Sequence, residues 1–149
     1  MSSSFRIRRA RADDLDALTA LEESAFDHDR VSRAQWRRHV ASASAAVLVA
    51  EKAGKVAGCA LLFFRRGSKR ARLYSIAISH AARGRGAGAA LLQAAEDEAR
   101  KRGCDTMRLE VRSDNAAAIA LYEKCGYSRR RLEPGFYENG AAAWRYQKP

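Results

Sequence analysis

The spacing of apolar residues divides the first third of the chain into a strand and two helices. Residues 5–9 alternate apolar and basic side chains, as a short strand does, and Asp13 then opens a helical segment. One face of this helix carries Leu15, Leu18, Leu21 and Ala25. Ser32 and Gln35 have the spacing of a capping box, which predicts a second helix up to about Ser42.

Three apolar, β-prone runs follow over residues 46–50, 56–64 and 71–78. The first two runs are joined by a short polar link in which Gly54 makes the turn, and the last two by the basic link 65–70. Consecutive strands with such short links predict an antiparallel meander.

The apolar period then changes from about 2 to about 3.6 residues. Leu91, Leu92, Ala95 and Ala99 share a helical face that ends before Gly103, and residues 106–111 read as a strand. A last helix over 115–124 and two closing strands over 127–132 and 142–147 complete the chain. This alternation predicts one domain over residues 1–149, a mixed α/β sheet with helices on both faces.

Composition and charge narrow the classes of partner. The net charge of +11 would attract polyanions, acidic proteins or a phosphate-rich cofactor. The arginines are spread along the whole chain, and no aromatic-interleaved nucleic-acid motif accompanies them, so a nucleic-acid partner is not expected. Hydrophobic residues make up 47% of the chain and charged residues 30%, the composition of a folded domain rather than a disordered one.

The cysteines and the apolar runs bear on location. Cys59, Cys104 and Cys125 form no CxxC pair, which predicts packed thiols and neither a disulfide framework nor a metal site. No run approaches the ~18 apolar residues of a membrane span, and residues 1–6 lack an apolar leader core. We therefore expect a cytoplasmic protein without a membrane partner.

A glycine-rich loop, Arg83-Gly84-Arg85-Gly86-Ala87-Gly88, lies between a predicted strand and a predicted helix. Small residues there let the first backbone amides of the helix approach an anion, which indicates a phosphate site. Gly84, Gly86 and Ala89 also fit a dinucleotide fingerprint, with Glu110 placed to contact a ribose. Against a dinucleotide, residues 79–83 separate the strand from Gly84, and the chain offers a single β-α-β unit.

Two segments resemble a known family. Residues 73–88, with the pattern Arg83-x-x-Gly86-x-Gly88, look like the core motif of the GNAT superfamily of acetyl-CoA-dependent N-acetyltransferases. Residues 109–122, LEVRSDNAAAIALY, are similar to the matching stretch of bacterial ribosomal-protein alanine N-acetyltransferases. The resemblance implies a mostly antiparallel sheet of about six to seven strands, splayed around the cofactor.

The resemblance also implies a site, with acetyl-CoA as acyl donor and no metal. Glu110 matches the family's general base and Tyr122 its general acid. The cofactor would be held by a pantetheine-binding strand, the glycine loop and one asparagine: Ile76, Ala77, Ile78, Arg83, Gly84, Arg85, Gly86, Ala87, Gly88, Ala89 and Asn115. From the residues alone, Glu110 reads as an outward-facing strand residue and Tyr122 as a core residue.

The chemistry of acyl transfer is consistent with these assignments. An amine attacking a thioester must lose a proton, and the departing thiolate must be stabilised, tasks that a carboxylate and a phenol can perform. The acceptor is a protein N-terminus, a lysine or a small-molecule amine, and the charge favours an acidic or peptide-like one. The alternatives are a catalytically silent domain binding CoA or a dinucleotide, and a basic nucleic-acid-binding module.

Two segments depart from the pattern of the alanine N-acetyltransferases. Residues 26–31 lack a proline-tryptophan pair, and residues 135–146 carry alanines where an acid is usual. Both segments are expected to wall the acceptor site.

Overall fold

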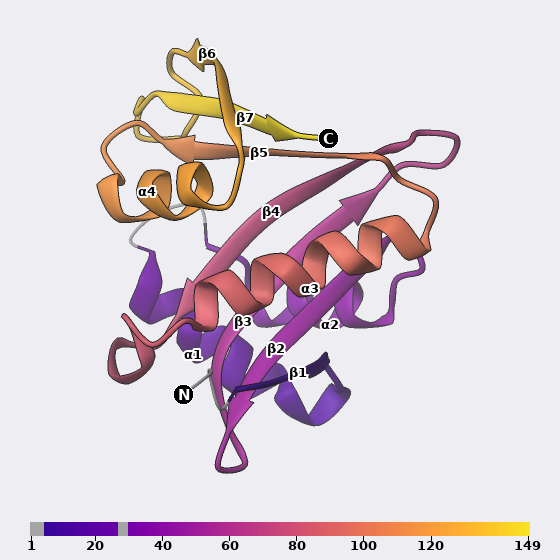
Figure 1. Ribbon diagram of the computed structural model, residues 1–149. Coiled ribbons are helices and arrows are strands. Elements are labelled where there is room, and N and C mark those ends of the chain that lie inside the picture. Colours follow the sequence, from indigo (N-terminus) through magenta and orange to yellow (C-terminus); the bar gives the residue numbers. More distant parts are fainter. Residues whose placement is uncertain (1–4, 27–29) are drawn as a thin grey trace.

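The computed structural model describes residues 5–26 and 30–149. Its elements follow one another in the predicted order (Figure 1). The strands are β1 (Arg6–Arg9), β2 (Ala45–Lys52), β3 (Lys55–Phe64), β4 (Arg70–Ile78), β5 (Thr106–Arg112), β6 (Ser128–Glu133) and β7 (Ala143–Lys148). The helices are α1 (Leu15–Ala25), α2 (Arg33–Ala41), α3 (Ala87–Lys101) and α4 (Ala116–Lys124).

The strands form a 7-stranded sheet in the order β1-β2-β3-β4-β5-β7-β6. Within the described residues, the β4–β5 pair alone is parallel, and each of the other neighbouring pairs is antiparallel. The predicted meander is β2-β3-β4, and the fold prediction of a mostly antiparallel sheet with helices on both faces is confirmed.

Each face of the sheet has its own core. Helices α1 and α2 cover one face over β2 and β3 through a cluster that contains Leu18, Trp36 and Leu61. Helix α3 runs across the opposite face, where Leu91 and Leu92 pack on residues of β2 to β5. The alternation of apolar residues along the strands therefore supplies both cores, and it places α1 and α3 on opposite sides of β4 (Figure 1).

The sheet opens in the middle, between its two parallel strands. The ladder between β4 and β5 runs from the Arg70 and Thr106 pair to the Leu73 and Leu109 pair. Strand β4 continues to Ile78 and β5 to Arg112 without further pairing to each other, so the strands diverge (Figure 1). The splay predicted from the resemblance is therefore present in the sheet itself.

The predicted helix starts are present, one of them shifted by two residues. The capping box is formed, because the Gln35 amide donates to Ser32 Oγ at 3.1 Å and the Ser32 amide donates to Gln35 Oε1 at 2.7 Å. The first α-helix begins at Leu15 rather than Asp13, since a 3-10 turn over Ala12–Asp14 precedes it.

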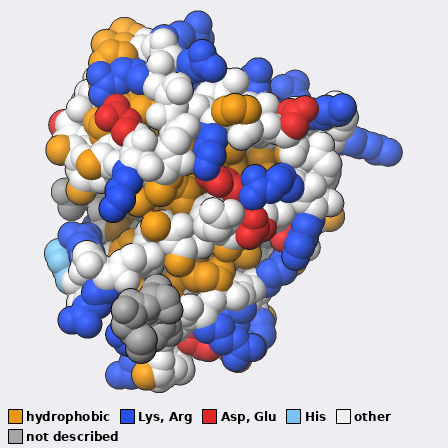
Figure 2. All heavy atoms as spheres, viewed as in Figure 1, with side chains coloured by type: hydrophobic (Ala, Val, Ile, Leu, Met, Phe, Trp, Pro, Cys, Tyr) orange, Lys and Arg blue, Asp and Glu red, His pale blue; other side chains and the backbone are white. Residues whose placement is uncertain are grey.

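Charges and thiols are placed much as expected. On the face that carries α3, Lys and Arg side chains are scattered rather than gathered in one block (Figure 2). Cys59 is buried, and burial raises the pKa of its thiol to about 12. No helix within the described residues is long and apolar enough to cross a membrane. In the same residues, no group of three or more His, Cys, Asp or Glu could hold a metal ion.

Candidate active site

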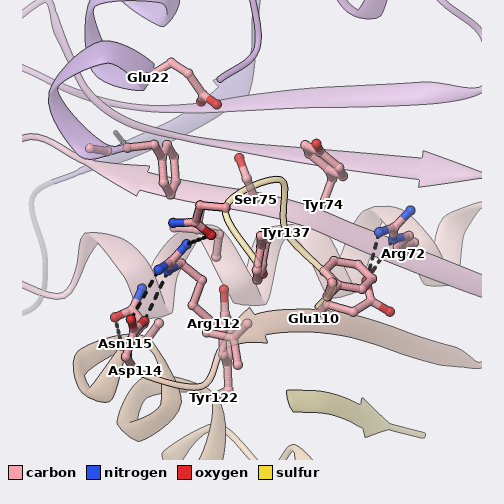
Figure 3. Close-up of a pocket in the computed structure, with 17 residues that line it drawn as sticks. Glu22, Arg72, Tyr74, Ser75, Glu110, Arg112, Asp114, Asn115, Tyr122 and Tyr137 are labelled. Carbon is pink, nitrogen blue, oxygen red and sulfur yellow. Dashed lines mark hydrogen bonds and ion pairs between the residues drawn. The ribbon is translucent and has the colours of Figure 1, made fainter. Parts of the chain in front are cut away.

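A pocket of about 660 Å³ lies where β4 and β5 diverge. Its walls come from α1, from the two diverging strands, from the start of α4 and from the β6–β7 connection (Figure 3). The residues that line it are Glu22, Ala25, Phe26, Arg72, Tyr74, Ser75, Ile76, Glu110, Val111, Arg112, Asp114, Asn115, Ala118, Tyr122, Phe136, Tyr137 and Asn139. Both predicted catalytic residues are among them.

Tyr122 projects from α4 into this pocket (Figure 3). Its ring packs edge to face against Tyr127 at a centroid distance of 5.9 Å, and the residue is buried. Burial raises the pKa of the Tyr122 phenol well above its usual range, because the phenolate would lose its hydration. The side chain is therefore both a core residue and a neutral hydroxyl aimed into the pocket.

Glu110 lies on β5 between two arginines from the neighbouring strands. Its Oε1 accepts from Arg72 Nε on β4 at 3.0 Å, and its Oε2 accepts from Arg145 Nε on β7 at 3.1 Å. The glutamate side chain is only 3% exposed. Glu110 lines the pocket, yet both of its oxygens already accept hydrogen bonds from guanidinium groups.

The glycine loop forms the start of α3. Gly86 is the N-cap residue with φ 89°, and Gly84 has φ 77°, left-handed conformations that favour glycine. The first helical hydrogen bond runs from the Ala90 amide to the Gly86 carbonyl, which leaves the amides of residues 87–89 directed out of the helix start. This arrangement can receive a phosphate.

Gly88 and Asn115 also have structural roles that the sequence did not reveal. A Cβ atom on Gly88 would lie 3.1 Å from Leu121 Cδ2, so this glycine lets α3 approach α4. Asn115 is the N-cap of α4, and its Oδ1 accepts from the Ala118 amide at 3.1 Å. Gly88 therefore allows the close approach of α3 and α4, and Asn115 defines where α4 begins.

The end of β4 borders the gap between the strands. Residues 75–78 pair with β3 on one side, and no ladder joins them to β5 among the described residues. Ile76 lines the pocket, and residues 76–78 run from it toward the glycine loop. The backbone of Ile76, Ala77 and Ile78 is thus at the strand edge to which an extended ligand could add as a further strand.

The β6–β7 connection supplies an aromatic wall. Phe136 and Tyr137 pack edge to face at a centroid distance of 5.0 Å, and both line the pocket. Arg112 ties this connection to the end of β5, because its Nη1 donates to Asn139 Oδ1 at 3.4 Å and its guanidinium lies over the Tyr137 ring. Residues 26–31 are the other segment that departs from the pattern of the alanine N-acetyltransferases, and of these residues 27–29 lie outside the described residues.

Glu22 on α1 and Ser75 on β4 are among the pocket residues that the sequence did not single out. Glu22 is 2% exposed and lies among the apolar side chains of its helix. Burial raises its pKa to about 7. An acidic residue inside an apolar helical face was the available signal, although an EE pair at residues 22–23 reads by itself as a solvated helix surface.

The dinucleotide alternative does not fit the structure. Its binding fold is a doubly wound parallel sheet, whereas this sheet has a single parallel pair. Glu110, the expected ribose contact, is held by Arg72 and Arg145 instead.

Comparisons with known proteins agree with this geometry. The ribosomal protein bS18-alanine N-acetyltransferase of Escherichia coli (strain K12) is 45% identical over 67 residues, which span 45% of each chain. The match thus covers less than half of that relative's length. The crystal structure of the ribosomal-protein-S18-alanine N-acetyltransferase from Escherichia coli superposes with a TM-score of 0.85 at 30% identity, covering 97% of this chain and 93% of that one.

The structure of Ard1 from Thermoplasma volcanium shares the fold, with a TM-score of 0.88 at 24% identity over 97% of each chain. Residues 11–127 match the model of the acetyltransferase (GNAT) family. That match confirms the resemblance drawn from the glycine loop and from residues 109–122. The chain belongs to the GNAT family of acetyltransferases.

Proposed function

We propose that the protein is an N-acetyltransferase that moves the acetyl group of acetyl-CoA to a primary amine by direct attack. The observation that carries this proposal is the pocket between β4 and β5. The neutral Tyr122 hydroxyl and the buried carboxylates of Glu22 and Glu110 line it, next to the end of β4 that does not pair with β5. The Escherichia coli relative is named as an N-acetyltransferase of an alanine of ribosomal protein bS18, which supports an α-amine as acceptor.

The cofactor would lie along the gap between the diverging strands. The amides of residues 87–89, with the flanking Arg83 and Arg85, offer donors and positive charge to its pyrophosphate. The edge of residues 76–78 offers backbone groups to the pantetheine arm, and Asn115 still has its amide NH₂ group to donate. The thioester then comes to the pocket that Tyr122 lines.

Tyr122 would protonate the departing sulfur. Because burial keeps its phenol neutral, the hydroxyl can donate to a developing thiolate throughout the physiological pH range. Glu110 matches the family's proton acceptor by resemblance, but both of its oxygens already accept hydrogen bonds from Arg72 and Arg145.

The acceptor we propose is a polypeptide with acidic residues near its reactive amine. Four arginines share one face of β4, β5 and β7 next to the pocket: Arg70, Arg72, Arg108 and Arg145. Arg72 and Arg108 are direct register partners. Burial lowers the pKa of Arg108, Glu110 opposes this shift, and the three neighbouring arginines lower the pKa further by repulsion. Three arginines that repel the Arg108 charge make this face favourable for an anionic ligand.

A calorimetric titration with acetyl-CoA tests the cofactor, with NAD and NADP run as controls. Selective binding of acetyl-CoA is expected, followed by acetylation of a synthetic peptide with an N-terminal alanine, detected by mass spectrometry. A preference for NAD would refute the assignment of the cofactor. Selective acetyl-CoA binding without transfer to peptides, lysine or small amines would favour the catalytically silent alternative.

A further inference from the structure

Two buried polar atoms without a hydrogen-bond partner belong to residues of the same pocket. They are Glu22 Oε1 on α1 and Ser75 Oγ on β4. Figure 3 shows the Glu22 carboxylate directed toward the side of the pocket on which Ser75 lies. Because buried polar groups are nearly always paired in folded proteins, two orphaned oxygens in one cavity indicate a missing ligand that donates hydrogen bonds.

The protein holds Glu22 in place by its other oxygen. Glu22 Oε2 accepts from the Val31 amide at 2.9 Å, which fixes the carboxylate and leaves Oε1 for the pocket. The charged or titratable groups that face it, among the described residues, are Arg30 and the Cys59 thiol on β3. Burial outweighs the Val31 hydrogen bond and the Arg30 charge, so the pKa of Glu22 rises to about 7.

Glu110 provides the contrast within the same pocket. Two guanidinium groups saturate its carboxylate, and Arg145 also pairs with Glu133 at 3.4 Å. A carboxylate in such a network is a poor receiver for a further cation, because the nearby arginines repel it. The acceptor amine, when protonated, would therefore meet unbalanced negative charge at Glu22 and not at Glu110.

We propose that Glu22 and Ser75 form the subsite that binds the acceptor's primary amine as an ammonium ion, and that Glu22 removes its first proton. The proposal rests on the acetyltransferase function and deepens it. Ser75 Oγ accepts a second N–H of the ammonium group and orients it. Glu110 is then a positioning residue, which holds Arg72 and Arg145 on the sheet.

The protons of the reaction balance with these residues alone. Glu22 takes one proton from the ammonium nitrogen, whose lone pair forms the new C–N bond to the thioester carbon. The C–S bond then breaks, and Tyr122 gives its proton to the sulfur. The nitrogen loses its second proton to the Tyr122 oxygen, and Glu22 releases the first one to solvent, so one proton leaves per acetyl group.

Binding of the amine can be measured without turnover. In protein labelled with ¹³C at glutamate carboxyl carbons, the Glu22 and Glu110 resonances are assigned by their loss in Glu22→Gln and Glu110→Gln. A large excess of L-alaninamide should lower the pKa of Glu22, because a bound cation favours the carboxylate. An unchanged pKa of Glu22 overturns the proposal, whether or not Glu110 responds.

Kinetics supply the second test, with Glu23→Gln as the matched control on the exposed side of the same helix. Glu22→Gln should lower kcat/KM for the N-terminal alanine peptide by about 10² to 10⁴. In Glu22→Gln, kcat/KM should also no longer decrease as pH falls below about 7. Glu23→Gln should keep the wild-type kcat/KM and its decrease at low pH. Loss of that pH limb in Glu110→Gln and its survival in Glu22→Gln would overturn the proposal.

The two failures remain distinguishable. Acetyl-CoA binding by Glu22→Gln, measured calorimetrically, shows that the variant is folded around its cofactor site. If the wild-type protein binds acetyl-CoA but acetylates no amine, the proposed function fails, while the L-alaninamide titration still decides whether Glu22 receives an amine.

Discussion

Glu22 and Glu110 line the same pocket with opposite electrostatic surroundings. Glu110 lies between Arg72 and Arg145, whereas Glu22 has one oxygen on a backbone amide and the other without a partner. Of these two glutamates, Glu110 is thus neutralised by ion pairs, whereas Glu22 has no ion-pair partner among the described residues. This difference governs both the stability and the chemistry expected of the site.

The first prediction is that Glu22→Gln stabilises the protein at high pH. The raised pKa means that the folded state binds the proton more tightly than the unfolded chain, whose glutamates titrate near 4.3. Wild-type stability should therefore decline as pH rises from about 4.3 to about 7, a penalty that the neutral glutamine side chain of the variant lacks. Between pH 4 and 8, the variant should gain about 1 to 3 kcal/mol relative to wild type.

Urea unfolding at several pH values measures this effect, and Glu23→Gln serves as the control because residue 23 is exposed. A pH-independent difference between Glu22→Gln and wild type would contradict the raised pKa. The glutamine side chain can still accept from the Val31 amide, so that hydrogen bond need not be lost.

Tyr122→Phe should lower kcat by about 10² to 10⁴, as removal of an acid catalyst does, while the affinity for acetyl-CoA stays nearly unchanged. The ring remains to pack against Tyr127, so the fold should persist. Steady-state kinetics and calorimetry on one preparation separate the two effects. Unchanged turnover would exclude the phenol from the mechanism.

Gly86→Glu should abolish acetyl-CoA binding. Gly86 is the N-cap of α3 with φ 89°, so a glutamate side chain strains the turn and places a negative charge where the pyrophosphate is expected. Gly67→Glu is the matched control, since Gly67 has φ 79° and open space around it in the β3–β4 turn. If both variants lose affinity equally, backbone strain rather than a blocked phosphate site is the cause.

The order of elements could be predicted from the sequence because each apolar pattern reports on one local period. The runs that became β2, β3 and β4 differ from the observed strands by a few residues at most. The hairpin between β2 and β3 is tighter than expected, a two-residue turn of Ala53 and Gly54, because the ladder extends to Lys52 and Lys55.

The site was less accessible to sequence reasoning, because side chains from distant segments create it. Glu110 could be selected from its motif, but Arg72 and Arg145, which occupy its oxygens, are 38 and 35 residues away. Glu22 carries no motif, and its unusual state arises from burial beneath β3 and β4, which helical periodicity alone does not reveal.

Arg108→Gln should selectively weaken the binding of an acidic acceptor peptide. Arg108 makes no salt bridge within residues 5–26 and 30–149, and the nearby Glu110 carboxylate pairs with Arg72 and Arg145 instead, so the Arg108 charge is available to a ligand. We expect KM for a peptide with acidic second and third residues to rise about threefold to tenfold, in line with one charge-assisted contact. KM for acetyl-CoA should not change, and Arg66→Gln, in the exposed β3–β4 turn, should be neutral.

Comparing KM for acidic and basic peptides tests whether the acceptor is acidic. Wild type should prefer the acidic peptide, and added salt should reduce this preference by screening the charges. A preference for basic peptides would contradict an acidic acceptor. Tight binding of duplex DNA in about 200 mM salt, in place of peptide, would favour the nucleic-acid alternative.

The last prediction concerns the ion pair that anchors α1, and with it Glu22, to the sheet. Arg8 on β1 binds both oxygens of Asp14 at 2.9 and 3.0 Å, and the Asp14 side chain is only 7% exposed. The Arg8 guanidinium lowers the pKa of Asp14, so the pair stabilises the fold at neutral pH and this stabilisation is lost as pH falls.

Asp14→Asn should therefore destabilise the protein by about 1 to 3 kcal/mol at pH 7. The difference in the free energy of unfolding between Asp14→Asn and wild type, measured with urea, should become smaller below about pH 3.9. Asp13→Asn, at a side chain 80% exposed, should change stability by less than about 0.5 kcal/mol, and an equal loss in both variants would argue against the buried pair as the cause.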